Sequence, residues 1–288
     1  MGYLIHIAIL FAIYSILGLS LNLIVGYTGL FSMTHAVFYG IGAYTTALLL
    51  TVRGMDFFVS VAVGVMIAVI ISLVSGIVLS RFSDDYYAIV SLGFGVIVYA
   101  VFLNWQELTR GPFGIPGIGR PSVMNFVFSS GESFLILSLS ALGLVFLASR
   151  FIVRSSFGRV LKAIREDEKA IRVFGYNTTY YKLAIFVMVA MMAAVAGSLY
   201  ASYLTFIGPS IFMLRESIFI LAIIILGGLG SLGGSIVGAL FMILLPEVLR
   251  FVGLPSSIAA QMRQVIYGVI LIVLMLYRPQ GLIGKYRM

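Results

Sequence analysis

The sequence of 288 residues contains no cysteine and only two histidines, His6 and His35. Without cysteine there is no disulfide, no thiolate nucleophile and no cysteine-based metal site. Two distant histidines cannot form an H-E-x-x-H zinc motif, and no Ser/His/Asp arrangement can be argued. No G-x-x-x-x-G-K-S/T phosphate-binding loop occurs, since Gly281–Lys285 does not match that pattern. The chain is therefore not expected to be an enzyme or to hydrolyse ATP itself.

Charged residues are the other shortage, at 10% of the chain against 61% hydrophobic residues and a mean hydropathy of +1.15. A soluble domain carries about 25% charged residues. The apolar residues are spread over the whole chain and leave no room for a soluble domain, and the alternating segments of a membrane barrel are absent. We predict an all-α, polytopic helical membrane protein with a single transmembrane domain over residues 1–288.

Nine hydrophobic segments match the ~20 residues that a helix needs to cross a bilayer core about 30 Å thick. They cover residues 3–25, 33–51, 57–80, 86–103, 132–150, 183–205, 217–231, 233–250 and 265–278. The second is weakened by Gly26, Gly29, Gly40 and Gly42, so it is predicted either to cross the membrane or to form a broken or re-entrant helix. The prediction is therefore about eight or nine transmembrane segments.

The basic residues orient the chain. Eight of the eighteen lie in one stretch, namely Arg150, Arg154, Arg159, Lys162, Arg165, Lys169, Arg172 and Lys182. Because lysine and arginine concentrate in cytoplasmic loops, the loop 151–182 is predicted to be cytoplasmic. The basic C-terminus is predicted to lie inside as well, and counting backwards puts the 104–131 loop and the N-terminus outside. This topology explains the net charge of +8 without nucleic-acid binding.

Residues 158–174 of the cytoplasmic loop are predicted to form one short amphipathic helix. At 100° per residue, one broad face collects Val160, Leu161, Ala163, Ile164, Ile171 and Phe174. Ser155 or Ser156 can cap the start of this helix, and Gly175 can end it.

Two interpretations of this helix are open. It can lie on an anionic membrane surface, or it can dock a cytoplasmic partner. Glu168 is placed to pair with Arg172 at the i,i+4 spacing. Asp167 and Glu168 also fall beside the apolar face, which suits a groove on a partner protein better than lipid.

Three motifs resemble the membrane subunits of ABC importers for branched-chain amino acids, the LivH/LivM type of permease. The family's coupling-loop motif is matched by Gly158, Arg159, Ala163, Ile164, Arg165, Glu166, Asp167, Glu168 and Gly175. The stretches Asn22–Ser32 and His35–Tyr44 look like its N-terminal signature, and Leu226–Gly234 looks like its third motif. Together these motifs extend over most of the chain.

The resemblance implies an ABC importer permease fold and a set of partners. These are a second, homologous permease subunit, two cytoplasmic ATP-binding subunits and an extracytoplasmic substrate-binding protein, in the plasma (inner) membrane of a bacterium or archaeon. No cofactor would be bound by this chain, because ATP would be used by the partner subunits. Branched-chain or other apolar amino acids are the implied substrates. Urea or short amides, or an ATP-independent secondary transporter, are the alternatives.

The N-terminal motif suggests residues that line a translocation pathway. Gly26, Tyr27, Thr28 and Gly29 place two glycines around an expected chain reversal, and unwound backbone at membrane depth often lines a site. His35 follows closely and is interpreted as a packing residue rather than a proton carrier. No acidic residue is clearly placed in the middle of a span, which argues against a proton-coupled carrier.

Two further groups of residues are assigned by pattern. Gly230, Gly234 and Gly238 recur at i, i+4 and i+8, a spacing that lets helix backbones pack closely.

The outside loop 109–121 contains three prolines and is predicted to have a defined, non-helical shape. It resembles the family's glycine-rich periplasmic loop. The candidate contacts of the binding protein are Arg110, Phe113, Gly114 and Arg120, with a plain connector as the alternative.

Overall fold

The computed structural model describes most of the chain. It covers residues 2–82, 84–123, 126–128 and 130–251, and beyond these 265–266, 268–269, 272–273, 276–277 and 280–284. The structure is almost entirely helical. Its strands are two antiparallel pairs of two residues each, β1 with β4 and β2 with β3.

The elements follow one another without a domain boundary. They are α1 (Gly2–Thr28), α2 (His35–Val52), α3 (Phe57–Leu79), α4 (Asp84–Asn104), α5 (Gln106–Thr109), η1 (Gly111–Phe113), β1 (Ile115–Pro116), β2 (Ser122–Val123), β3 (Phe126–Val127), α6 (Gly131–Arg154), α7 (Ser156–Glu166), α8 (Glu168–Val173), α9 (Thr178–Leu204), β4 (Phe206–Ile207), η2 (Pro209–Phe212), α10 (Leu214–Gly227) and α11 (Leu232–Phe251).

Six described helices are long and apolar enough to cross a membrane, namely α1, α2, α3, α4, α6 and α9. The helices α10 and α11 form a further pair, bent by 119° at a short break. These eight helices correspond to eight of the nine predicted segments. The ninth, 265–278, falls on a stretch where only scattered residues are described.

The second segment is an uninterrupted helix, so the expectation of a break there is wrong. Its glycines serve close packing instead. A Cβ at Gly42 would collide with the Ala194 carbonyl of α9, and one at Gly40 would lie 2.7 Å from the Phe102 ring. Glycine therefore lets neighbouring helices approach α2 without interrupting it.

The re-entrant feature lies instead in the pair α10 and α11. Before the pair, β4 is joined to the outside loop, where Ile207 pairs with Ile115. After it, Glu247 of α11 accepts a hydrogen bond from Tyr3, at the outer end of α1. The pair therefore enters and leaves on the side of the predicted outside loop. Gly234 and Gly238 allow its two arms to touch, because a Cβ at either would meet the backbone of α10.

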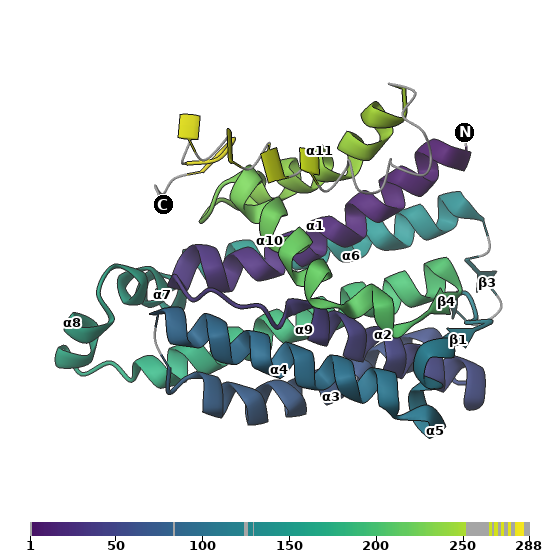
Figure 1. Ribbon diagram of the computed structural model, residues 1–288, viewed down its shortest axis with the longest axis horizontal. Helices are drawn as coiled ribbons and strands as arrows, with labels where there is room; N and C mark the ends of the chain where they lie inside the picture. Colours follow the sequence, from purple (N-terminus) through teal and green to yellow (C-terminus); the bar gives the residue numbers. More distant parts are fainter. Residues whose placement is uncertain are drawn as a thin grey trace.

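The helices α1, α2 and α9 form the centre of the protein. Most of the residues in their spans are buried, whereas α3, α4 and α6 keep mostly exposed, apolar surfaces. Figure 1 shows α7 and α8 at one end of the bundle and α5, β1 and β3 at the other. This arrangement separates the predicted cytoplasmic loop from the predicted outside loop.

The packing of α9 against α2 gives a test of the fold. A Cβ at Gly197 would collide with the Tyr39 carbonyl oxygen, whereas one at Gly143 of α6 would meet nothing within 4 Å. Gly197→Leu should therefore lower the melting temperature of the detergent-purified protein strongly, since overpacking costs about 1–3 kcal/mol or more. Gly143→Leu is the matched control and should melt like the parent. Equal melting of the two variants would contradict the α2–α9 packing.

Candidate functional site

The cytoplasmic loop contains two short helices, so the prediction of one helix over 158–174 is wrong. The break lies at Asp167, whose φ of −155° and ψ of 99° are extended. Its carboxylate accepts hydrogen bonds from the backbone N–H of Lys169 (2.9 Å) and Ala170 (3.0 Å). Aspartate competes well for such N-terminal N–H groups, so it starts α8 instead of continuing α7.

The predicted caps of this loop are confirmed. The Ser155 hydroxyl accepts from the Gly158 N–H at 3.2 Å and starts α7. Gly175 follows α8 with a φ of +86°, a conformation that favours glycine. Gly158 itself is buried, and a Cβ there would collide with the carbonyls of Ile152 and Val153. Glycine at this position therefore lets α7 turn back closely against α6.

Glu168 ties α8 to the start of α9. Its carboxylate pairs with Arg172 at 2.6 Å, as the i,i+4 spacing predicts, and with Lys182 at 2.5 Å. The Thr178 hydroxyl donates to it at 3.0 Å. The Lys182 side chain is only 1% exposed. Asp167 and Glu168 therefore both have partners within the chain, while the Asp167 side chain stays exposed and its contact with a groove on another protein stays a prediction.

The surroundings of Glu168 also set its ionisation. Burial opposes the charged form, but the hydrogen bond and positive charge of Lys182, with Thr178 and Arg172, hold the pKa of this carboxyl below its usual range. The ion pair is therefore present at neutral pH and fixes the direction in which α8 projects.

The inner face of α7 rests on the cytoplasmic end of α1. Leu161 and Ile164 are buried there. The Arg165 guanidinium donates to the Gly26 carbonyl oxygen, and the Lys162 ammonium lies 5.6 Å from the centre of the Tyr27 ring. The structure thus brings together two motifs that sequence analysis treated separately, the coupling loop and the stretch 26–29.

Asn22 joins α1 to the bend between α10 and α11. Its amide nitrogen donates to the Ser231 carbonyl (2.9 Å) and the Ser235 hydroxyl (2.7 Å), and its oxygen accepts from the Gly230 N–H (3.0 Å). A Cβ at Gly26 would collide with both Asn22 and Gly230. The sequence did not single out Asn22, because an asparagine in an apolar helix shows its role only when its partners are known.

The C-terminal residues brace the same bend. The N–H of Leu282 donates to the Leu226 carbonyl and that of Ile283 to the Gly227 carbonyl, both at 2.9 Å. Gly230 has a φ of +71° and lies in the bend rather than in α11. Of the three glycines predicted to pack in one helix, Gly230 therefore shapes the turn, while Gly234 and Gly238 pack α11 against α10.

The unwound backbone lies at 29–34 and not at 26–29. Gly26, Tyr27 and Thr28 are the last turn of α1, and Gly29 follows with a φ of +75°. His35 then starts α2 beside Ser20, with 2.8 Å between its Nε2 and the serine oxygen. Ser20 precedes the end of α1 by eight residues, or about 12 Å of helix. The chain therefore runs back into the membrane before α2 begins, and His35 is a buried packing residue.

The outside loop is held in shape by glycine turns and one strand pair. Gly111, Gly114 and Gly117 have positive φ, and η1 gives the loop a single helical turn that was not predicted. Among the candidate contacts of a binding protein, Arg110, Phe113 and Arg120 are exposed. Gly114 is buried under the Ile207 carbonyl and cannot serve as a contact.

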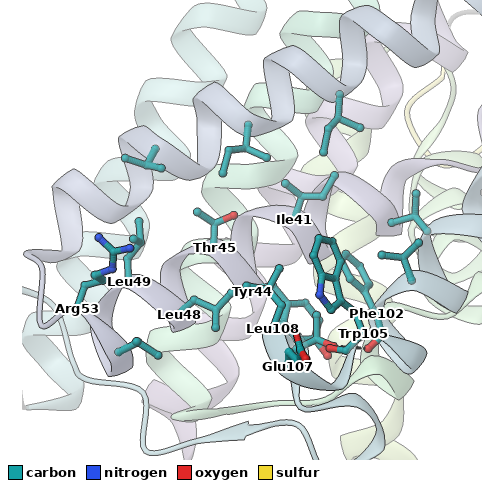
Figure 2. Close-up of a pocket in the computed structure, with 17 residues that line it drawn as sticks. Ile41, Tyr44, Thr45, Leu48, Leu49, Arg53, Phe102, Trp105, Glu107 and Leu108 are labelled. Atoms are coloured by element: carbon teal, nitrogen blue, oxygen red, sulfur yellow. Dashed lines mark hydrogen bonds between the residues drawn. The ribbon is translucent and has the colours of Figure 1, made fainter.

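A cavity of about 640 Å³ lies between the outer halves of α2, α3 and α4. Figure 2 shows Ile41 and Leu48 of α2, with Phe102 and Trp105 at the end of α4. Most of its lining is aliphatic or aromatic, and Arg53 and Glu107 are its charged residues. Such a crevice suits hydrocarbon, and it contains none of the predicted pathway residues.

The six apolar helices and the bent helix pair are those of a multi-spanning helical membrane protein. Residues 3–275 match the family described as the permease component of branched-chain amino acid transport systems. The chain belongs to this family, and its resemblance to it is confirmed.

Three relatives show how far the similarity extends. LivM of the high-affinity branched-chain amino acid transport system of Escherichia coli K12 is 36% identical over 98% of this chain and 70% of its own length. LivH from Salmonella typhimurium is 29% identical over 94% of this chain and 91% of its own. A probable LivM from Methanocaldococcus jannaschii is 25% identical over 96% and 91%. No solved structure matches this chain.

The Glu168–Lys182 pair predicts a pH-dependent loss of stability. Glu168→Gln should lower the free energy of unfolding by a few kcal/mol at neutral pH, because Lys182 is left buried without its counter-charge. A carboxyl with a lowered pKa stabilises the folded protein only when it is ionised. The difference in the free energy of unfolding between Glu168→Gln and the parent should therefore shrink as the pH falls below about 4.5.

Thermal melts between pH 3 and pH 7 would measure this difference. Glu166→Gln, an exposed carboxylate two residues away, is the control and should melt like the parent at every pH. A pH-independent difference for Glu168→Gln would contradict the ion-pair explanation.

The Asn22 bridge gives a second test. Asn22→Leu keeps the volume but removes three hydrogen bonds and leaves the buried Gly230 N–H without its acceptor, at a cost of about 1–3 kcal/mol. We expect a lower melting temperature and faster proteolysis of the α10–α11 bend. Asn104→Leu, at a residue that only bonds its own helix on the exposed outer side, should change neither.

Proposed function

We propose that this chain is a permease subunit of an ATP-driven importer for branched-chain amino acids, in the plasma membrane of a bacterium or archaeon. With a second, homologous permease subunit it encloses the translocation pathway. An extracytoplasmic binding protein delivers the substrate, and two cytoplasmic ATP-binding subunits drive transport. The names of the relatives support the substrate class. The contact of α7 with α1 at Arg165 and Gly26 is the observation that carries the coupling role.

The ATP-binding subunits dock on a surface that we call the α8 tip, formed by Val173, Phe174 and Tyr176. These side chains are 87%, 78% and 46% exposed. The apolar residues Leu161 and Ile164 of α7 are already buried in the chain. Because Leu161 and Ile164 are covered, the exposed large apolar side chains of the loop are concentrated at the α8 tip. The α8 tip lies at the far cytoplasmic end of the bundle (Figure 1).

Movement of the docked subunits reaches the membrane through three contacts. The ion pairs of Glu168 hold α8 on the start of α9, so a displacement of the α8 tip also moves the start of α9. Arg165 passes the displacement of α7 to the end of α1. Asn22 then passes it from α1 to the bend of α10 and α11. Each step is a short polar contact between packed helices, as mechanical coupling requires.

Reconstitution of the complete importer tests this function. Proteoliposomes that contain both permeases and the ATP-binding subunits, supplied with the binding protein, should accumulate leucine only with ATP, and isoleucine and valine should compete. Transport without ATP would favour the secondary transporter instead. Competition by urea and not by the amino acids would favour the amide carrier.

The docking surface predicts a specific loss of coupling. Phe174→Ala should reduce leucine-stimulated ATP hydrolysis and weaken co-purification of the ATP-binding subunits, because an exposed aromatic anchor of an interface is removed. Phe151→Ala, at an equally exposed phenylalanine of α6, is the matched control and should retain both. Equal coupling in the two variants would contradict docking at the α8 tip.

A further inference from the structure

Glu216, in the first turn of α10, lies level with the middle of α1. The predicted hydrophobic segment begins at residue 217, and the expectation that no acidic residue lies at the middle of a span is wrong for Glu216. In the structure its carboxylate accepts a hydrogen bond of 2.7 Å from Tyr14. Tyr14 is the thirteenth of the 27 residues of α1 and marks the midplane. An ionisable residue at this depth is retained for function by default, because its burial is costly.

Two tyrosines complete a polar cluster around this acid. The Tyr39 side chain is fully buried, and its hydroxyl has no hydrogen-bond partner among the described residues. Tyr14, Tyr200 and Glu216 are the titratable groups near enough to influence that hydroxyl electrostatically. The ring of Tyr39 packs 5.3 Å from that of Tyr200. An unpartnered hydroxyl beside an acid is a polar site that lacks its ligand.

Glu216 forms no ion pair among the described residues, although the charge of the neighbouring Arg215 favours its ionised form. The described ion pairs are both made by Glu168, and Arg215, the charged neighbour of Glu216 on α10, is exposed. A carboxylate in the bilayer interior is stabilised by a positive charge. The cluster therefore suits a ligand that brings one.

Two helices begin beside the cluster. The Ala36 N–H at the start of α2 donates to the Ser217 hydroxyl in the first turn of α10, at 3.0 Å. The amino ends of α2 and α10 therefore meet at membrane depth, where their dipoles favour a negative group. A cavity of about 190 Å³ lies at this junction and is lined by Met33, Val37, Val96, Phe212, Leu214 and Ser217 among others.

The cavity adjoins the cluster, although Tyr14, Tyr39, Tyr200 and Glu216 do not line it. Phe212 lines the cavity and packs 5.2 Å from the ring of Tyr39. The lining of this cavity is mainly aliphatic, and the cavity volume is below the roughly 300 Å³ at which pockets for drug-sized ligands begin. It is therefore suited to a small apolar group.

We propose that this junction is a binding site for the amino acid in transit, halfway across the membrane. Glu216 and the Tyr39 hydroxyl hold the ammonium group, the amino ends of α2 and α10 face the carboxylate, and the cavity beside Ser217 receives the apolar side chain. The inference rests on the proposed import function and adds the residues that recognise the substrate inside the permease. It also explains why an acid and an unpartnered hydroxyl are kept where hydrocarbon would be less costly.

Tyr39→Phe is the decisive variant. If Tyr39 has only a structural role, removal of a buried, unpartnered hydroxyl should be neutral or stabilising. If it holds the ammonium group, ATP-driven leucine uptake should fall by about two- to tenfold while the melting temperature stays the same or rises. Tyr44→Phe is the matched control, because Tyr44 is also buried on α2 with an unpartnered hydroxyl but lies in the outer cavity. It should transport like the parent.

Glu216→Gln should reduce uptake by more than about tenfold, as expected for a hydrogen bond to a charged group. All variants are compared in the complete reconstituted importer, per folded protein. Uptake by Tyr39→Phe equal to that by Tyr44→Phe would overturn the site while leaving the import function intact. A parent protein without ATP-dependent leucine uptake would overturn the proposed function, and the site with it.

Discussion

Asn22 holds the first transmembrane helix against the bend between α10 and α11 with both polar atoms of its amide. The bend depends on this contact, because its backbone lies inside the membrane and has no water to satisfy its N–H and C=O groups. The space for the contact is provided by Gly26, where any side chain would displace the amide. Once the bend is fixed, α10 starts at the midplane, and the start of α2 can meet it there.

The same constraint explains the many hydroxyls beside the unwound segment 29–34. The Met33 N–H donates to Ser91, the Ala36 N–H to Ser217 and the Leu30 N–H to Thr28. Each hydroxyl replaces a partner that a continuous helix would have supplied. Helix starts can be placed at membrane depth only with such substitutes. The polar residues of these apolar helices are therefore distributed according to the breaks in the backbone.

On the cytoplasmic side, ion pairs give the loop its rigidity. Glu168 is shared between Arg172, Thr178 and the buried Lys182, so α8 cannot swing independently of α9. The apolar face of α7 is covered by the chain, and the exposed aromatic surface is left at the α8 tip. The loop thus has two parts: α7 packs against the membrane helices, and the α8 tip is exposed for contact with another protein. Arg165 contacts α1 and Asn22 belongs to it, so α1 connects the cytoplasmic end of the protein with the membrane interior.

The sequence by itself determined the class of this protein. Apolar segments of about 20 residues and one basic loop fix a helical membrane topology, because the bilayer imposes length and charge rules that any chain must obey. Caps such as Ser155 and Gly175 were equally predictable, since they depend on neighbours a few residues away. The tertiary structure alone decided which polar residues act together. The placement of Glu216 at the midplane and the partnership of Asn22 with Gly230 depend on contacts across 202 and 208 residues. The break at Asp167 depends on a competition between local hydrogen bonds. Hydrophobicity encodes neither.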